Sequence, residues 1–225
     1  MNKKKKLITI GIVLIVGIIL LFGLLLPNKK NNNVDGRKLK NNYEKLNGKT
    51  SEDGKKYVSV DVESDNVIKY VSIDKVLDIL SNKSGVIYIG SSKSAYSRSA
   101  INILIEASND SNIDKVYYYD IDNICDIKNL DQKTGIIKNC EDNDKVKQLY
   151  EKLDNIYKGY TLESNILILP TVLFVSNGEI VSSNIKTIPT HKNPYSKLVK
   201  SQEEGLKEIY MSGLDDIINN KNLAN

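Results

Sequence analysis

The sequence predicts an α/β domain behind one N-terminal transmembrane helix. The first observation is an uncharged run of 20 residues, Leu7–Leu26, which at about 1.5 Å per residue spans the hydrocarbon core of a bilayer. The second is that, after this run, short apolar stretches alternate with segments whose apolar residues recur every three or four positions. About 200 residues follow the run, which suits one domain with a single core.

The N-terminal region predicts a signal-anchor layout. Residues 1–6, with Lys3–Lys6, are expected to form a cytoplasmic tail, and the C-terminal domain is expected outside the cell membrane. Lysines also follow the span, so the positive-inside rule does not decide the orientation alone. A cleaved signal peptide is the alternative, but its apolar stretch is roughly 7–15 residues and ends at a small-residue site, which is missing here. Residues 27–54 are polar and predict a flexible stalk before a domain over 55–225.

The charge balance argues against nucleic-acid binding. The chain has 32 Lys plus Arg and 28 Asp plus Glu. Four of the lysines precede the apolar run, which leaves 28 basic and 28 acidic residues after it. Non-specific attraction to a phosphate backbone needs a basic surface, and a neutral domain does not supply one.

The first half of the domain predicts two strands, a helix, a third strand and a second helix. Residues 56–61 alternate in polarity and predict an edge strand, with 67–71 as its expected partner. Ser72 suits the N-cap of a helix whose apolar residues follow the i, i+3, i+4, i+7 spacing. Val86–Ile89 is wholly apolar, as a buried central strand would be. A second helix with one apolar face is expected from about Ala95.

The second half predicts a strand, an insertion, a helix, a hairpin and a final helix. Residues 115–121 predict a core strand, whereas 122–140 have no sustained period and predict an inserted loop. Acidic residues then favour a helix N-terminus near Glu141. The remaining elements are strands at 171–175 and 179–183, joined by an Asn177-Gly178 turn, and a helix over 202–219.

Two segments carry a resemblance to a known family. In Val86–Arg98 an apolar strand runs into a loop and a helix start, and in Leu169–Gly178 a Leu-Pro-Thr sequence leads into a strand and a tight turn. This order resembles the thioredoxin-like fold, a central mixed sheet flanked by helices, over Ser72–Ile218. The nearest subgroup is the membrane-anchored, bacteriocin-transport-accessory type. The resemblance implies a cis peptide bond before Pro170.

The resemblance also implies a peptide groove, but without its redox chemistry. The groove would consist of Ser94, Ala95, Tyr96, Ser97, Leu169 and Pro170, with Tyr96 exposed and the helix amides free. Where the family has its two cysteines, this chain has Ser94 and Ser97, and a hydroxyl cannot replace the thiolate in disulfide exchange. The resemblance therefore implies a non-catalytic module that binds an extracytoplasmic protein or peptide. The alternatives are that Ser94 is only a helix cap, or that the chain is an inactivated form of a C-x-x-C enzyme.

The two cysteines predict a disulfide. Cys125 and Cys140 are the only cysteines, and an even number outside the cell favours pairing. The bridge would close a loop of about 15 residues, worth roughly 3 kcal/mol. Two alternatives remain open: free thiols, and a displaced redox pair that would make the protein a thiol-disulfide oxidoreductase.

Other chemistry has weak support in the sequence. His191 is the only histidine; a catalytic triad would need it beside Ser94 or Ser97, and no G-x-S-x-G motif is present. The acidic residues between 114 and 131 lack EF-hand spacing, so no metal is expected. No P-loop or dinucleotide-binding motif occurs, and no cofactor is expected.

Overall fold

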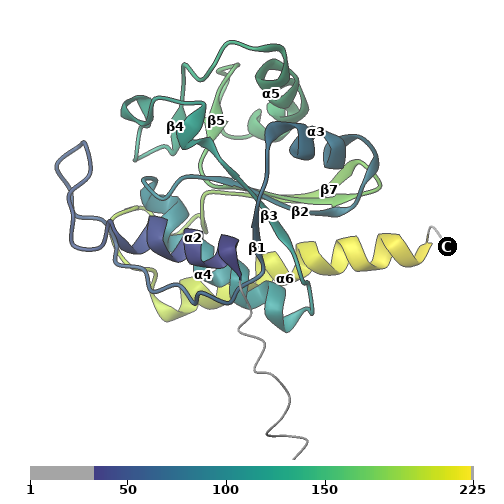
Figure 1. The fold of residues 1–225 in the computed structure, drawn as a ribbon, viewed down its shortest axis with the longest axis horizontal. Coiled ribbons are helices and arrows are strands. Elements are labelled where there is room, and N and C mark those ends of the chain that lie inside the picture. The colour runs from purple at the N-terminus through teal and green to yellow at the C-terminus, as the bar shows by residue number, and fades with distance from the viewer. Residues whose placement is uncertain (1–32, 224–225) are drawn as a thin grey trace, which may run out of the picture. The chain divides into compact units, whose positions relative to one another are not determined.

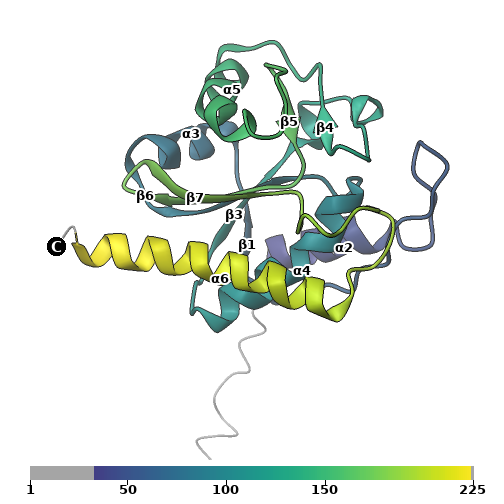
Figure 2. The same cartoon turned by 180° about the vertical axis from the view of Figure 1, so that it is seen from behind.

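A computed structural model describes residues 33–223, which form a mixed α/β domain (Figures 1 and 2). Its five-stranded sheet has the order β1-β3-β2-β6-β7. The strands are β1 Ile68–Tyr70, β2 Gly85–Gly90, β3 Val116–Asp120, β6 Thr171–Ser176 and β7 Glu179–Ile185. Strands β1, β3 and β2 run parallel, while β6 is antiparallel to β2 and β7. A small second sheet pairs β4 (Ile136–Ile137) with β5 (Leu167–Ile168).

Helices cover both faces of the main sheet. They are α2 Val34–Glu44, α3 Ile73–Asn82, α4 Ala95–Asp110, α5 Asp144–Tyr157 and α6 Lys200–Leu223. Two 3₁₀ turns, η1 Ile121–Asn123 and η2 Ile127–Asn129, follow β3. Helices α2, α4 and α6 lie on one face, and α3 and α5 lie on the other (Figures 1 and 2). This is the flanked-sheet architecture that the alternating sequence pattern predicts.

The apolar run of β2 explains its central position. Val86 and Tyr88 belong to the core shared with α2, α4 and α6. Ile87 and Ile89 belong to the core on the α3 and α5 side. All four are at most 1% exposed. Since successive side chains on a strand point to opposite faces, a strand that is buried on both faces needs an unbroken apolar run.

Local signals place the helix starts and the hairpin. The Ser72 side chain caps α3 by accepting a hydrogen bond from the Lys75 amide, as predicted. Asn177 and Gly178 both have positive φ, 53° and 85°, and join β6 to β7. A Cβ at Gly178 would lie 2.5 Å from backbone atoms of Ser81, so only glycine fits there.

The predicted strand at 56–61 is wrong. β1 pairs with β3 instead, with Ile68 opposite Val116. Side chains occupy the backbone groups that a ladder would use: Val58 O accepts from Arg98, and Asn47 bonds both the amide and the carbonyl of Val60. Only its start pairs with backbone, through a bridge between Lys56 and Thr50 and the Tyr57 amide on the Lys49 carbonyl; side chains hold the rest.

The predicted stalk is wrong for the part that the structure describes. Helix α2 lies within the range 27–54, and Leu39 and Tyr43 on it are fully buried against the domain. Their i, i+4 spacing is the apolar stripe that a packed helix needs. Residues 1–32, with the predicted tail, the predicted span Leu7–Leu26 and the start of the stalk, lie outside the described residues. Between residues 33 and 223, no helix is long and apolar enough to cross a membrane.

Candidate functional site

The structure brings the two predicted halves of the groove to one edge of the main sheet. Ile89, near the end of β2, pairs with Thr171 at the start of β6. The loop that leads into α4 therefore leaves the sheet beside the residue that precedes β6. The peptide bond between Leu169 and Pro170 is cis, as the resemblance implies.

The two serines lie in the buried start of α4. The Ser94 side chain caps the helix by accepting a hydrogen bond of 3.2 Å from the Ser97 amide, which confirms that Ser94 is an N-cap. Both residues are at most 1% exposed. The Ser97 hydroxyl has no hydrogen-bond partner among the described residues. Neither hydroxyl contacts a base that could activate it as a nucleophile.

The inserted segment between the two cysteines covers the start of α4. We call residues 126–139 the strap. The Gln132 side chain accepts a 2.8 Å hydrogen bond from the Ala95 amide and donates one of 2.8 Å to the Lys93 carbonyl. The Tyr96 hydroxyl donates to the Lys133 carbonyl at 3.1 Å, and Tyr96 is only 5% exposed. The expectation of an exposed Tyr96 and open helix amides is therefore wrong, because the strap satisfies these groups.

The strap also covers the side of the groove that contains the cis proline. The Leu169 amide donates a 2.8 Å hydrogen bond to the Gly135 carbonyl. Directly after Gly135, β4 pairs antiparallel with β5. Gly135 has a φ of 76°, and a Cβ there would lie 2.8 Å from the Leu169 carbonyl oxygen, so glycine permits this close approach. An extended piece of the chain itself thus pairs with the backbone next to Pro170.

Acidic and basic side chains connect the residues just before the strap to the loop that precedes α4. Asp122 accepts a hydrogen bond from the Ser91 hydroxyl and forms a 3.3 Å ion pair with Lys93. Asp120, at the end of β3, accepts a hydrogen bond from the Asp122 amide. Burial, and then the nearby Asp122 charge, raise the pKa of Asp120 to about 6. The end of β3 therefore carries Asp120, whose ionised form is disfavoured by burial, and is followed by Asp122, which is paired.

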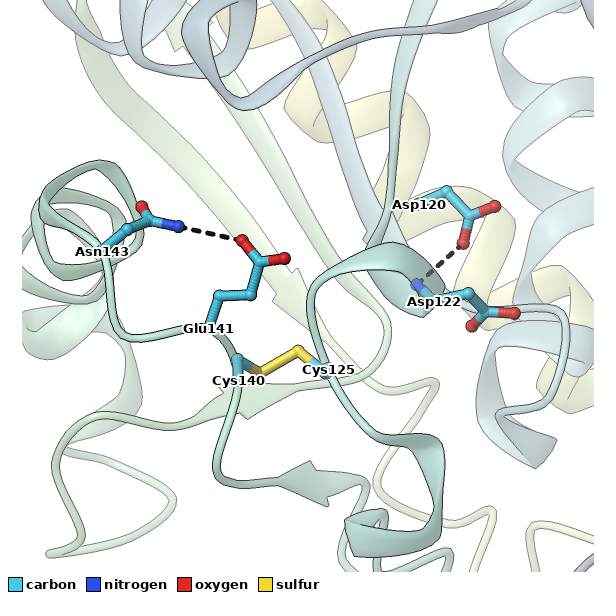
Figure 3. Close-up of a disulfide and its surroundings, with 6 residues drawn as sticks. All are labelled: Asp120, Asp122, Cys125, Cys140, Glu141 and Asn143. Carbon is cyan, nitrogen blue, oxygen red and sulfur yellow. Dashed lines mark hydrogen bonds between the residues drawn. A yellow bond between two sulfur atoms is a disulfide. The ribbon is translucent and has the colours of Figure 1, made fainter.

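Cys125 and Cys140 form the predicted disulfide (Figure 3). Their Cα atoms are 4.0 Å apart, so the bridge closes the strap at its base. Glu141 follows Cys140 directly, and its carboxylate accepts a hydrogen bond from Asn143. The bridge contradicts the free-thiol alternative, and the displaced redox pair stays a prediction for an exchange assay.

Arg98 is a buried hydrogen-bonding residue that the sequence motifs did not predict. It is 2% exposed, and its guanidinium donates to the carbonyls of Val58, Tyr43 and Ser92 and to the Asn47 side chain, at 2.6–3.2 Å. Burial lowers the pKa of Arg98. Arg98 precedes Ile101 and Ile105 by three and seven positions on α4, so its place on the apolar stripe was the available signal.

His191 takes no part in a catalytic triad with the two serines. It is 4% exposed; its Nδ1 bonds the Thr187 hydroxyl and its Nε2 bonds the Ser196 carbonyl, each at 3.0 Å. Because a carbonyl only accepts, Nε2 carries the hydrogen and Nδ1 accepts from Thr187. Both ring nitrogens are thereby used away from Ser94 and Ser97. Burial lowers the pKa of His191, which favours this neutral ring.

Comparison with known proteins does not assign the chain. No protein-family model matches it, and no curated protein matches it. Within residues 33–223, no group of three or more His, Cys, Asp or Glu side chains could hold a metal ion. The chemistry of the site therefore has to be argued from the geometry above.

Proposed function

We propose that residues 33–223 form a thioredoxin-like domain that binds a protein or peptide partner and performs no dithiol chemistry. The strand order, the cis bond before Pro170 and the helix start beside it support this assignment. One observation carries the functional half of the proposal. Oxygen atoms of Ser94 and Ser97 occupy the first turn of α4, where dithiol exchange would need a thiolate and a resolving thiol.

The strap is the present occupant of the binding groove. The Gly135 carbonyl of the strap accepts a hydrogen bond from the Leu169 amide. The Gln132 side chain accepts one from the Ala95 amide. The first is a backbone contact of the kind that an extended peptide makes when it adds to the edge of a sheet. A partner peptide would bind by displacing the strap from these same amides.

The location proposed for this domain is the outer side of a membrane, held by Leu7–Leu26 as an uncleaved anchor. The disulfide supports an oxidising compartment. Fractionation should recover the full chain with membranes after a high-salt wash, and protease added to intact cells should remove the domain. Recovery of the domain in the soluble fraction, or its protection from protease, would contradict this location.

A dithiol-exchange assay separates a binding module from an enzyme. The full chain in mild detergent should reduce insulin at the background rate, and the Ser94→Cys/Ser97→Cys double variant should gain activity. The single variant Ser94→Cys is the matched control, because one thiol cannot resolve a mixed disulfide. Turnover by the unmodified chain that Cys125→Ser abolishes would instead establish the alternative, a thiol-disulfide oxidoreductase that uses Cys125 and Cys140.

A binding experiment tests the groove directly. Because the strap ends are 4.0 Å apart at the bridge, residues 126–139 can be replaced by a two-glycine turn in the full chain. A synthetic peptide with the sequence of residues 130–139 should then bind the shortened chain in calorimetry, and bind the intact chain at least tenfold more weakly because its own strap competes. A scrambled peptide is the control. Equal binding of the two peptides would exclude the groove as a peptide site.

A further inference from the structure

A pocket of about 480 Å³ includes Tyr96 in its lining but neither Ser94 nor Ser97. Tyr96 of α4 and Tyr160, which follows α5, provide aromatic walls. Lys133 comes from the strap, and Lys186 and Lys192 come from the loop after β7. Its volume falls in the range of small-molecule sites in proteins, about 300–1,000 Å³. Tyr96 is the one residue that this pocket shares with the proposed groove.

The three lysines of this pocket have no acidic partners. Most lysines around the domain that lie near a carboxylate form ion pairs at 2.6–3.7 Å. In the described part of the chain, Lys133, Lys186 and Lys192 form none. The nearest acid is Asp131, whose carboxylate already accepts from the Thr134 hydroxyl and the Lys133 amide. The pocket therefore carries an excess of positive charge.

Lys186 is held in the pocket by its backbone. Its amide donates a 2.7 Å hydrogen bond to the Pro170 carbonyl, and its φ is 64°, in the region that favours glycine. Non-glycine residues held in this region concentrate at functional sites. The Nζ atom lies 5.6 Å from the Tyr96 ring centre and 6.0 Å from the Tyr160 ring centre. Burial, and then the nearby Lys192, lower the pKa of Lys186, a cost that a bound anion would relieve.

His191 lines this pocket with a neutral aromatic ring and does not add a charge. Its ring meets Tyr96 edge-on at 5.8 Å between ring centres, and both of its nitrogens are already bonded. Ile188 and Ile209 complete an apolar floor. Within the described residues, the lining thus combines apolar and aromatic side chains with lysines that form no ion pair.

We propose that this pocket binds a compact molecule that carries one anionic group, a carboxylate or a phosphate, on an apolar body. The anionic group pairs with Lys186 and Lys192, and the body packs between the two tyrosine rings. Desolvated pairing of this kind is stronger than pairing at an open surface, because the local dielectric is lower. The proposal does not depend on the proposed function of the groove, because the anionic group pairs with Lys186 and Lys192, which lie outside the strap.

Ligand-observed NMR on the full chain in mild detergent tests this proposal with three compounds. Phenylacetate and phenyl phosphate carry the two candidate anionic groups, and 2-phenylethanol is the neutral control. We expect at least one anion to bind, the neutral alcohol to bind about tenfold more weakly, and the difference to shrink as salt is added. The stronger of the two anions identifies the preferred group. Equal binding of all three compounds, or binding of none, would overturn the proposal.

Two variants locate the binding. Lys192→Gln changes an exposed side chain, and Lys186→Gln changes a half-buried one. Each should lower the affinity for the anion about five- to tenfold. Lys56→Gln is the matched control, since Lys56 is exposed and lies outside the pocket. Thermal unfolding checks that each variant is folded, and Lys192→Gln remains informative if Lys186→Gln is not. Unchanged affinity in a folded Lys192→Gln variant would exclude this pocket.

Discussion

Two segments cover the start of α4, and they are attached in different ways. The segment 33–62 is fastened by Arg98, a fully buried charge that donates to three carbonyls and one amide oxygen. The strap is held by neutral groups: the half-buried Gln132 side chain makes two hydrogen bonds, and the Lys133 and Gly135 carbonyls accept one each. Removing a buried charged donor strands several acceptors, whereas removing a neutral one strands few. We call residues 33–62 the first cover and the strap the second cover. We therefore expect the first cover to stay on α4 and the second cover to separate from α4 while the domain remains folded.

Side-chain packing also differs between the two segments that cover α4. Leu39 and Tyr43 of the first cover belong to the core that α4 shares with α6. The strap contributes Leu130 and Ile137 to the opposite core, pairs its β4 with β5 outside the strap, and is closed by the disulfide. A segment closed by its own bridge can leave the groove without unravelling the domain. The following changes test this difference, from the largest expected effect to the smallest.

Arg98→Met should cause the largest loss of stability. The change leaves the carbonyls of Tyr43, Val58 and Ser92 buried without their donor, and we expect about 4 kcal/mol less free energy of unfolding in urea titrations. Lys49→Met, at an exposed lysine in the same segment, is the control and should change it by less than about 0.5 kcal/mol. Similar losses in the two variants would show that the first cover does not depend on Arg98.

Cys125→Ser with Cys140→Ser should cost about 3 kcal/mol, because the disulfide spans 15 positions and no longer restricts the unfolded chain. Hydrogen exchange should show the Ala95 and Leu169 amides, which the strap protects, opening faster than the amides of β2. Equal acceleration throughout the sheet would mean that the strap is not a separable unit.

Asp120→Asn should stabilise the protein at neutral pH. An acid whose pKa is higher in the folded state than in the unfolded state lowers stability above that pKa, and protonation removes the cost. We expect a gain of about 2 kcal/mol at pH 7 that shrinks as the pH falls through 6 towards 4. Asp114→Asn, at an exposed acid, is the control. A gain that does not depend on pH would reject the raised pKa as its cause.

Gln132→Ala should have the smallest effect, about 1 kcal/mol, because it removes two neutral hydrogen bonds at a half-buried position. The same change should raise the hydrogen-exchange rate of the Ala95 amide. The exchange rate of the Val58 amide, which belongs to the first cover, should stay the same. Gln202→Ala, at the start of α6, provides a comparison at a glutamine outside both covers. A loss as large as that of Arg98→Met would remove the distinction between the two covers.

Much of the fold follows from local patterns. The all-apolar run at 86–89 predicts the central strand, Ser72 and Ser94 predict the helix starts, and Asn177-Gly178 predicts the hairpin; the structure confirms each. These features depend on near neighbours in the chain, which a sequence displays directly. The disulfide was also predicted, from the number of cysteines alone.

The sequence by itself determined the alternating elements, their caps and the presence of oxygen in place of sulfur at residues 94 and 97. Only the tertiary structure decided that residues 33–62 pack against α4, that the strap fills the groove and that three lysines meet without an acid. The reason is physical: each of these outcomes joins residues dozens of positions apart. Hydrogen bonds between such distant groups leave no periodicity along the chain, so they become visible only once the backbone has folded.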